Sequence, residues 1–435
     1  GKSYTRPDMP LPARLDTLTQ DTASIGDLSW WELYNDTTLQ QLIHRTLTYN
    51  KDLKIASARM NELAALKRID FANMFPQATA RLNGNRETTN YGGDNFDADP
   101  ELSLTASISW ELDLWGNLRW ARDHSTAEFL ASVENCRAVK MGLVAQVAQS
   151  YFELMALDNE LAIVRRTLEA RREGVRLAEI RFKGGLTSEI VFQQAKVELA
   201  KTATMVPDLE RRISLKESEI ALLTGDFPYA VNRNILPEEI QLPDALPLGL
   251  PSTLLERRPD IRKAERELMA AHAEVGLAYT NMFPRLALTA TLGTESETLR
   301  DFLKSPYSYL AGNLLSPLFA MGKNRAALKA KRAAYEGAVA EYEQTVLTAF
   351  KETHDAIINF NKIKDIYESR RQLAEASRTA VELAQLQYIN GVIGYLDLLD
   401  AQRNYFDAQV SLSNAVCNKQ LMIINLYKAL GGGWK

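Results

Sequence analysis

The residues best placed for chemistry in this chain are two carboxylates, Asp397 and Asp400. Their spacing of three residues puts both on one face of a helix. Such a pair attracts cations and repels anions. The alternative interpretation is a solvated acidic helix start that offsets the helix dipole.

No residue pattern typical of an enzyme accompanies this pair. None of the four histidines has a second histidine four residues away, as a zinc-binding helix would require: His44, His124, His272 and His354. The two cysteines, Cys136 and Cys417, are far apart and make neither a disulfide framework nor a metal site. We therefore expect no catalytic residues, no metal and no cofactor.

The composition is that of a folded protein, and nothing in it indicates nucleic-acid binding. Of the 435 residues, 46% are hydrophobic and 24% charged, and the net charge is −4. No run of 18 apolar residues indicates a membrane-spanning helix. Strands of a membrane barrel alternate apolar and polar residues, so they would escape that criterion.

The sequence is internally duplicated. The segment Asn73–Pro76 (Asn-Met-Phe-Pro) recurs 208 residues later as Asn281–Pro284, and Gly116 recurs 206 residues later as Gly322. We expect a first repeat over 31–225 and a second over 251–435. A proline-containing linker over 226–250 joins them, and an extended arm over 1–30 precedes them.

Each repeat contains one alternating segment that predicts a β-hairpin, over about 77–115 and about 285–320. The clearest alternation is apolar at every second position: Leu102, Leu104, Ala106, Ile108, Trp110 and Leu112. Four strands cannot close a barrel, and open strand edges are not tolerated in lipid. If the hairpins lie in a membrane, several chains must therefore share one barrel.

A heptad stripe follows each hairpin and predicts a long helix, over about 116–183 and about 323–389. In the first repeat the stripe is Leu143, Val147, Ser150, Leu154, Leu157, Leu161, Val164 and Leu168. A second apolar stripe is offset from the first by two residues and so lies on nearly the opposite side of the helix. It indicates that another helix packs on each side, as in a wall of helices. Such a helix would span roughly 100 Å. Glycine-containing turns then lead to return helices, about 187–225 and about 395–430.

The doubled unit, the Asn-Met-Phe-Pro motifs and the helical tips together resemble the TolC-like outer-membrane efflux proteins. The chain is most similar to the lipoprotein branch that works with resistance-nodulation-division pumps. Four further segments support the resemblance: Tyr4–Pro7, Trp30–Trp31, Arg257–Ile261 and Leu430–Trp434.

The resemblance implies a mostly α-helical fold with a membrane β-barrel. Three chains would share a 12-stranded barrel that continues into a coiled-coil α-helical barrel across the periplasm. The homotrimer would bind a periplasmic adaptor protein and, through it, an inner-membrane transporter. A lipidated cysteine would precede Gly1 in the outer membrane. Drugs or other small toxic solutes would pass out passively, with no cofactor and no enzymatic step.

The resemblance also implies roles for residues at the helical tips. Asp397 and Asp400 would ring the periplasmic aperture, and Tyr388, Leu396 and Leu399 would help to close it. The tip turns and the adaptor contact would involve six residues: Arg181, Gly184, Gly185, Glu189, Asn390 and Gly391. Some relatives close the aperture with an arginine and an acid where this chain has Ile393 and Val191, so we expect no ionic latch at those positions.

Two other functions remain open on the sequence. One is a duct of the same fold for type I protein secretion, which sequence separates poorly from small-molecule efflux. The N-terminal arm and the Leu430–Trp434 ending favour efflux. The other is a coiled-coil scaffold without a pore, against which the apolar faces of the hairpins argue.

Overall fold

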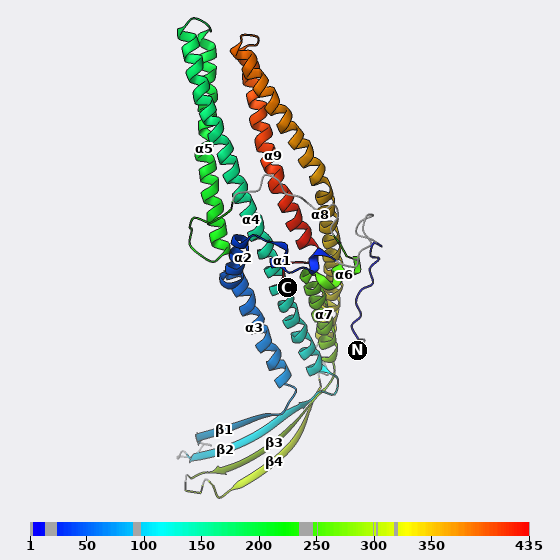
Figure 1. The fold of residues 1–435 in the computed structure, drawn as a ribbon. Coiled ribbons are helices and arrows are strands. Elements are labelled where there is room, and N and C mark those ends of the chain that lie inside the picture. The colour runs from blue at the N-terminus through cyan, green and yellow to red at the C-terminus, as the bar shows by residue number, and fades with distance from the viewer. Residues whose placement is uncertain are drawn as a thin grey trace. The chain divides into compact units, whose positions relative to one another are not determined.

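The computed structural model describes residues 3–13, 24–89, 97–234, 247–249, 251–298, 300–301, 303–316 and 321–434. Gly1, the rest of the expected arm (14–23) and most of the linker (235–246) lie outside the described residues, as does the end of the second hairpin (317–320). The described chain is mostly helical with four antiparallel strands, which confirms the expected fold class (Figure 1).

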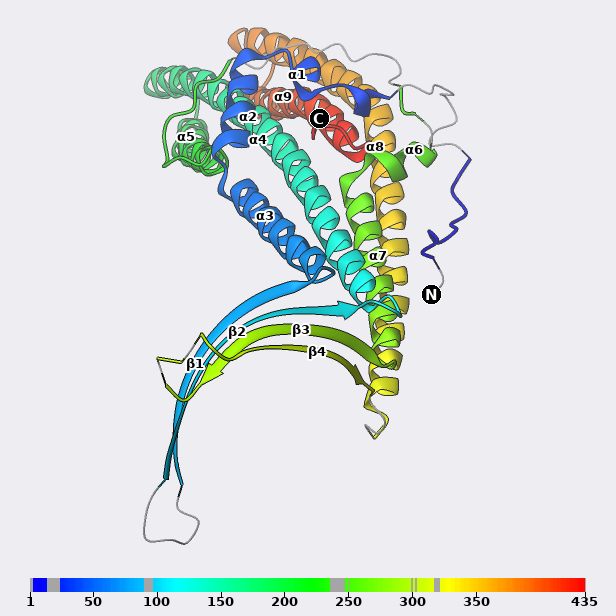
Figure 2. The same ribbon diagram turned by 90° about the horizontal axis from the view of Figure 1, so that it is seen from below.

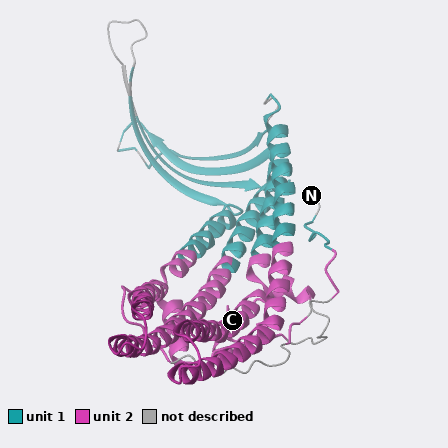
Figure 3. Cartoon of the chain, turned by 90° about the horizontal axis from the view of Figure 1, so that it is seen from above, with its two compact units in different colours: residues 1–9, 58–134, 263–345 teal, residues 10–57, 135–262, 346–435 magenta. Residues whose placement is uncertain are grey.

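The chain forms two compact units that do not follow the two sequence repeats (Figure 3). Unit 1 comprises residues 1–9, 58–134 and 263–345, and unit 2 comprises 10–57, 135–262 and 346–435. Each unit therefore takes parts of both repeats. Each of the two longest helices contributes its first part to unit 1 and the remainder to unit 2.

Unit 1 contains the sheet, whose strands lie in the order β1-β2-β3-β4 (Figure 2). The strands are β1 (Gln77–Thr89), β2 (Asp97–Leu112), β3 (Arg285–Ser296) and β4 (Pro306–Leu315). All neighbours are antiparallel, and β2 joins the hairpin of one repeat to that of the other through β3. Both outer strands, β1 and β4, have one edge without a partner strand among the described residues.

The sheet has one strongly apolar face. Large side chains at even positions are exposed: Leu82, Leu104, Ile108, Leu292, Leu310 and Leu314. Odd positions of β2 carry polar side chains, and the hydroxyls of Ser107 in β2 and Thr291 in β3 hydrogen-bond at 2.8 Å. This alternation is the period-two pattern seen in the sequence.

The repeated Asn-Met-Phe-Pro segments join helices to strands. They follow α3 (Lys51–Ala72) and α7 (Pro259–Thr280) and lead directly into β1 and β3. The indole of Trp115 stacks on Phe283 with ring centroids 5.0 Å apart and donates a 2.8 Å hydrogen bond to the carbonyl of Pro284. Gly116, at φ +83°, then turns the chain into the helix that follows β2.

Unit 2 contains two helical hairpins and shorter helices packed against them. The hairpins pair α4 (Asn117–Lys183) with α5 (Glu189–Leu223) and α8 (Lys323–Ile389) with α9 (Tyr395–Ala429). The short helices are α1 (Trp30–Leu33), α2 (Thr37–Tyr49) and α6 (Pro251–Arg257). The heptad stripe of α4 forms much of the core, since Val147, Leu154 and Val164 are completely buried.

Two segments that carried the family resemblance meet in unit 2. The buried guanidinium of Arg258 forms ion pairs with Asp260 (2.6 Å) and Glu352 (2.7 Å) and donates to the carbonyl of Ala429. The indole of Trp434 donates to the carbonyl of Arg257 at 3.2 Å. These contacts fix the end of α9 against α6 and α8.

Among the described residues, no helix contains an 18-residue stretch that is apolar enough to cross a bilayer.

Candidate functional site

The two hairpin tips have the same backbone geometry. In the first, Gly185 has φ +72° and the amide of Leu186 donates to the carbonyl of Arg181 at 2.8 Å. In the second, Gly391 has φ +72° and the amide of Val392 donates to the carbonyl of Gln387 at 2.8 Å. Glycine adopts this left-handed conformation without strain. The turn that it makes lets the following amide donate to one of the last carbonyls of the preceding helix. The remaining turn residues, Gly184 and Asn390, precede these glycines.

The structure places Asp397 and Asp400 on exposed turns at the start of α9. The carboxylate of Asp397 accepts a 3.0 Å hydrogen bond from the amide of Gly394 and caps the helix. Asp400 lies in the following turn and accepts a 3.3 Å hydrogen bond from the side-chain amide of Asn404. Both carboxylates therefore face solvent in the single chain. Their aperture role stays a prediction, and the capping bond of Asp397 agrees with the helix-start interpretation.

The two leucines expected near the aperture behave differently. Leu396 is 61% exposed, whereas Leu399 is only 2% exposed and packs within its own chain. Leu396 is thus available to an opposing chain. Leu399 is buried within the single chain, and its part in closing the aperture stays a prediction.

Tyr388 and Arg181, which the sequence assigned to separate roles, lie in contact. The guanidinium of Arg181, on α4, lies 4.7 Å from the ring centroid of Tyr388, on α8. Tyr388 also meets Tyr395 edge-on, with centroids 5.9 Å apart. Glu189 begins α5 in an exposed position and accepts a hydrogen bond from Gln193. The Arg181–Tyr388 pair therefore joins the two hairpins at their tips.

Further from the tips, a buried ionic cluster joins three helices. Glu198 of α5 forms an ion pair with Arg403 of α9 and lies 3.8 Å from Arg171 of α4. The guanidinium of Arg171 donates to Gln402. The side chains of Arg171 and Glu198 are 8% and 5% exposed, so this contact excludes most solvent.

The cluster shifts the protonation equilibria of its members. The hydrogen bond from Arg403 lowers the pKa of Glu198. Burial lowers the pKa of Arg171, although the charge of Glu198 opposes that change. Removing the carboxylate would leave the buried charge of Arg171 without its nearest counter-ion.

Sequence reasoning missed this cluster, although it left a signal. Arg171 continues the heptad stripe three residues after Leu168, at a position where an apolar residue is expected. Glu198 lies between the buried Ala195 and Thr202 on the inner stripe of α5. Charged residues on the inner stripes of two helices predict a buried ion pair only when it is known how the two helices align along their length.

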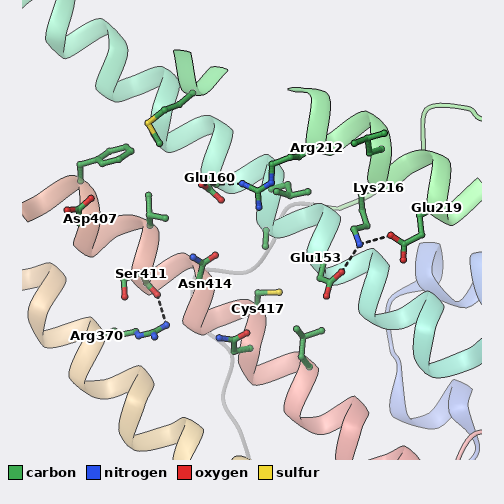
Figure 4. Close-up of a pocket in the computed structure, with 18 residues that line it drawn as sticks. Glu153, Glu160, Arg212, Lys216, Glu219, Arg370, Asp407, Ser411, Asn414 and Cys417 are labelled. Carbon is green, nitrogen blue, oxygen red and sulfur yellow. Dashed lines mark hydrogen bonds and ion pairs between the residues drawn. The ribbon is translucent and has the colours of Figure 1, made fainter. Parts of the chain in front are cut away.

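A hollow of about 960 Å³ lies over α4 between α5 and α9 (Figure 4). The ammonium of Lys216 bridges Glu153 (2.9 Å) and Glu219 (2.7 Å) on its wall. Arg212 lies 4.0 Å from Glu160, and Arg370 donates to the carbonyl of Ser411. The hollow therefore combines charged walls with apolar patches.

The described residues offer no cluster of three or more His, Cys, Asp or Glu side chains suited to a metal ion. Cys417 borders the hollow, where burial raises the pKa of its thiol to about 12. That thiol is protonated at neutral pH and a poor nucleophile.

Comparison with known proteins covers nearly the whole chain. A family model described as outer membrane efflux protein matches residues 42–226 and 250–432. Outer membrane protein OprJ of Pseudomonas aeruginosa is 32% identical, over 99% of this chain and 92% of its own. Probable outer membrane lipoprotein SilC of Salmonella typhimurium is 29% identical, over 99% and 94%. The solved structure of the outer-membrane channel OprN superposes with a TM-score of 0.89 at 30% identity, covering 99% of both chains.

Proposed function

Since the chain belongs to the outer membrane efflux protein family, it is an outer-membrane channel of an efflux pump, and we propose that it acts there as a passive exit duct. Drugs or other small toxic solutes would pass through it from the periplasm to the exterior. The chain would supply no enzymatic step, so the driving force would come from a partner.

The sheet of unit 1 is the observation that carries this proposal. It exposes a row of leucines on one face, which suits contact with lipid. In the described part of the chain each outer strand has one edge without a partner, and a membrane requires such edges to be paired. Three copies would supply twelve strands, above the roughly eight that small membrane barrels need. We propose a homotrimer that shares one barrel in the outer membrane.

The hairpins of unit 2 would line the passage through the periplasm. Tyr151 and Asp158 of α4 bond to Asp36 and Arg233, so one face of α4 is covered by the chain itself. Glu153 and Glu160 come two residues after these, about 200° around the helix, and face the open hollow. We propose that this hollow belongs to the inner wall of the duct.

The hairpin tips would form the periplasmic gate. Three copies would place six carboxylates, from Asp397 and Asp400, around one opening, where they would favour cations. The Arg181–Tyr388 contact would hold the two hairpins of each chain together in the closed state. Leu396 would close the opening by packing against other chains, with Leu399 supporting it from within.

Membership of the family also supports a proposal for the partners and the membrane anchor. The tip turns, with Arg181 and Glu189, would contact a periplasmic adaptor, which would bind an inner-membrane resistance-nodulation-division transporter. A lipid would be attached to a cysteine preceding Gly1. The name of SilC, an outer membrane lipoprotein, supports this anchor.

Deletion in the native host tests the efflux role. In a strain without its other channels of this family, deletion should raise the accumulation of a cationic dye and the susceptibility to drugs. A plasmid copy should reverse both changes. If deletion left both unchanged but stopped the release of a secreted protein, the type I secretion alternative would be supported instead.

A further inference from the structure

The first turns of α8 carry positive charge on one side. Arg325, Lys329 and Arg332 are spaced by four and three residues, so they share one face of the helix, which we call the basic face. All three are exposed, and none has an ion-pair partner within the part of the chain that the structure describes. The next charged residue on this face is Glu336, so the cations gather at the end of α8 that lies next to the sheet.

The equivalent helix of the first repeat does not present this charge. The corresponding residues of α4, 206 positions earlier, are Arg119, Asp123 and Thr126. Arg119 forms an ion pair with Asp113 at 3.0 Å, and Asp123 forms one with Arg122 at 2.6 Å. The two helix starts are otherwise alike, since each follows a glycine with a positive φ. The unpaired charge of α8 is therefore not needed for the fold that the two repeats share.

A second hollow, of about 610 Å³, shows on which side of the sheet the basic face lies. The hollow is lined by Ala327 of α8 and by Arg285 and Leu315, which are paired between β3 and β4. Leu314, one residue before Leu315, is exposed on the apolar face, so the hollow lies on the other side of the sheet. Lys329 comes two residues after Ala327, about 200° around the helix. The basic face therefore points away from the hollow, to the same side as the apolar face.

Aromatic side chains at this end of the sheet indicate where a membrane surface would lie. Trp110, at an even position of β2, is 39% exposed, and Tyr279 of α7 is 43% exposed. Exposed Trp and Tyr are enriched where the hydrocarbon of a membrane meets water. The helix α8 begins at the same end of the sheet (Figure 2). The basic face therefore starts next to the level at which the apolar face would leave the hydrocarbon.

The length of the basic face matches the charged layer of a membrane. Arg325 is the third residue of α8, and Arg332 lies roughly 10 Å farther along the helix. The headgroup layer adds roughly 5–8 Å to each side of the hydrocarbon core. Electrostatic attraction extends a further 8–10 Å or so at moderate salt. Since Lys and Arg side chains can also extend toward the membrane, all three cations would be close enough to attract headgroups.

We propose that the basic face binds anionic phospholipid headgroups at the periplasmic surface of the outer membrane. The inference rests on the proposed placement of the sheet in that membrane, and it adds the class of lipid that the chain selects. A guanidinium binds a phosphate through two parallel hydrogen bonds, whereas an ammonium acts as a point charge. An anionic surface favours each nearby cation about fivefold. These contacts would fix the depth at which the barrel sits.

Spin-labelled lipids test the proposal in phosphatidylcholine vesicles that contain the full chain. The fraction of label immobilised by the protein gives the relative association of phosphatidylglycerol and phosphatidylcholine. The test variant neutralises the basic face by Arg325→Gln, Lys329→Gln and Arg332→Gln. A second variant, Arg325→Lys with Arg332→Lys, keeps the charge. The matched control removes three exposed cations farther along the same helix, by Lys351→Gln, Lys362→Gln and Arg378→Gln.

The wild type should associate with phosphatidylglycerol up to about fivefold more strongly than with phosphatidylcholine, and high salt should reduce this preference. The neutralised variant should lose most of it, while the control and the charge-keeping variant should retain it. The salt dependence of the wild type needs no substitution, so it tests the proposal even if the neutralised variant does not fold.

Three results would overturn the inference. A wild type that conducts ions but shows no preference, or a preference that neutralisation leaves unchanged, would reject the lipid contact and leave the duct standing. Dissociation of the trimer in the neutralised variant, with the lipid preference intact, would assign the basic face to a contact between copies. Failure of the wild type to insert into vesicles would contradict the proposed duct as well.

Discussion

The guanidinium of Arg181 lies 4.7 Å from the ring centroid of Tyr388, and this contact joins the tip of one helical hairpin to the tip of the other. The two residues are on α4 and α8, which come from different repeats. In the proposed duct the hairpin tips form the gate, so this contact would have to break or shift when the duct opens. It therefore provides a direct way to test the proposed gate.

Substitution of Arg181 by Ala should increase the open probability of the channel. A cation–π contact at an exposed site contributes about 0.5–1 kcal/mol, which corresponds to roughly a two- to fivefold change in the open-to-closed ratio. Single-channel recording measures this ratio. Arg181→Lys keeps a cation and should lie between the two, and Arg172→Ala, on the same helix, should have no effect. An unchanged ratio in Arg181→Ala would remove this contact from the gate.

Glu198→Ala should destabilise the helical hairpins strongly. Loss of one partner of a buried ion pair typically costs about 3–5 kcal/mol, because the opposite charge stays buried and uncompensated. The measurement is the melting temperature of the purified protein in detergent. Glu169→Ala removes an exposed partner of Arg172 and should change the melting temperature little. Equal effects of the two substitutions would show that the Arg171–Glu198–Arg403 cluster does not stabilise the fold.

The same cluster predicts a dependence of stability on acid pH. The hydrogen bond from Arg403 lowers the pKa of Glu198 in the folded chain from its ordinary value of 4.5. Its stabilising contribution is therefore complete above pH 4.5 and is lost as the pH falls through the lower, folded-state pKa. Melting temperatures of wild type and Glu198→Gln measured across pH 3–7 should converge in acid. A constant difference between them would contradict the assignment.

Gly276→Ala should destabilise the chain, although alanine is normally preferred in a helix. Its Cβ would come within 2.3 Å of the Trp120 ring, so the indole would have to move. Gly142→Ala is the matched control, since its Cβ would have nothing within 4 Å and should stabilise the helix by up to about 1 kcal/mol. Thermal unfolding of both variants gives the comparison. A stabilising Gly276→Ala would show that this close packing is not needed.

The sequence predicted the fold well because its main elements follow simple periodicities. The alternation of Leu102–Leu112 identified β2, and the heptads after Gly116 identified one uninterrupted helix, α4. The order of the four strands was not predicted, because pairing between β2 and β3 depends on residues more than 170 positions apart in the chain.

The candidate site was only partly visible in the sequence. Local signals located the tip turns at Gly185 and Gly391 and the acidic start of α9. The contact of Arg181 with Tyr388 was not predicted, because it depends on how two separate hairpins align side by side. The burial of Leu399 could not be predicted from the sequence either. Leu396, three residues earlier, is the same residue type but is exposed.

The conductance of the purified protein in planar lipid bilayers tests the central claim most directly, with Asp397→Ala and Asp400→Ala recorded beside the wild type. The account predicts small, cation-selective currents from the wild type and larger or less selective currents from the variants. Variants identical to the wild type would place the gate elsewhere. No current from well-folded wild-type protein would contradict the duct and favour a scaffold without a pore.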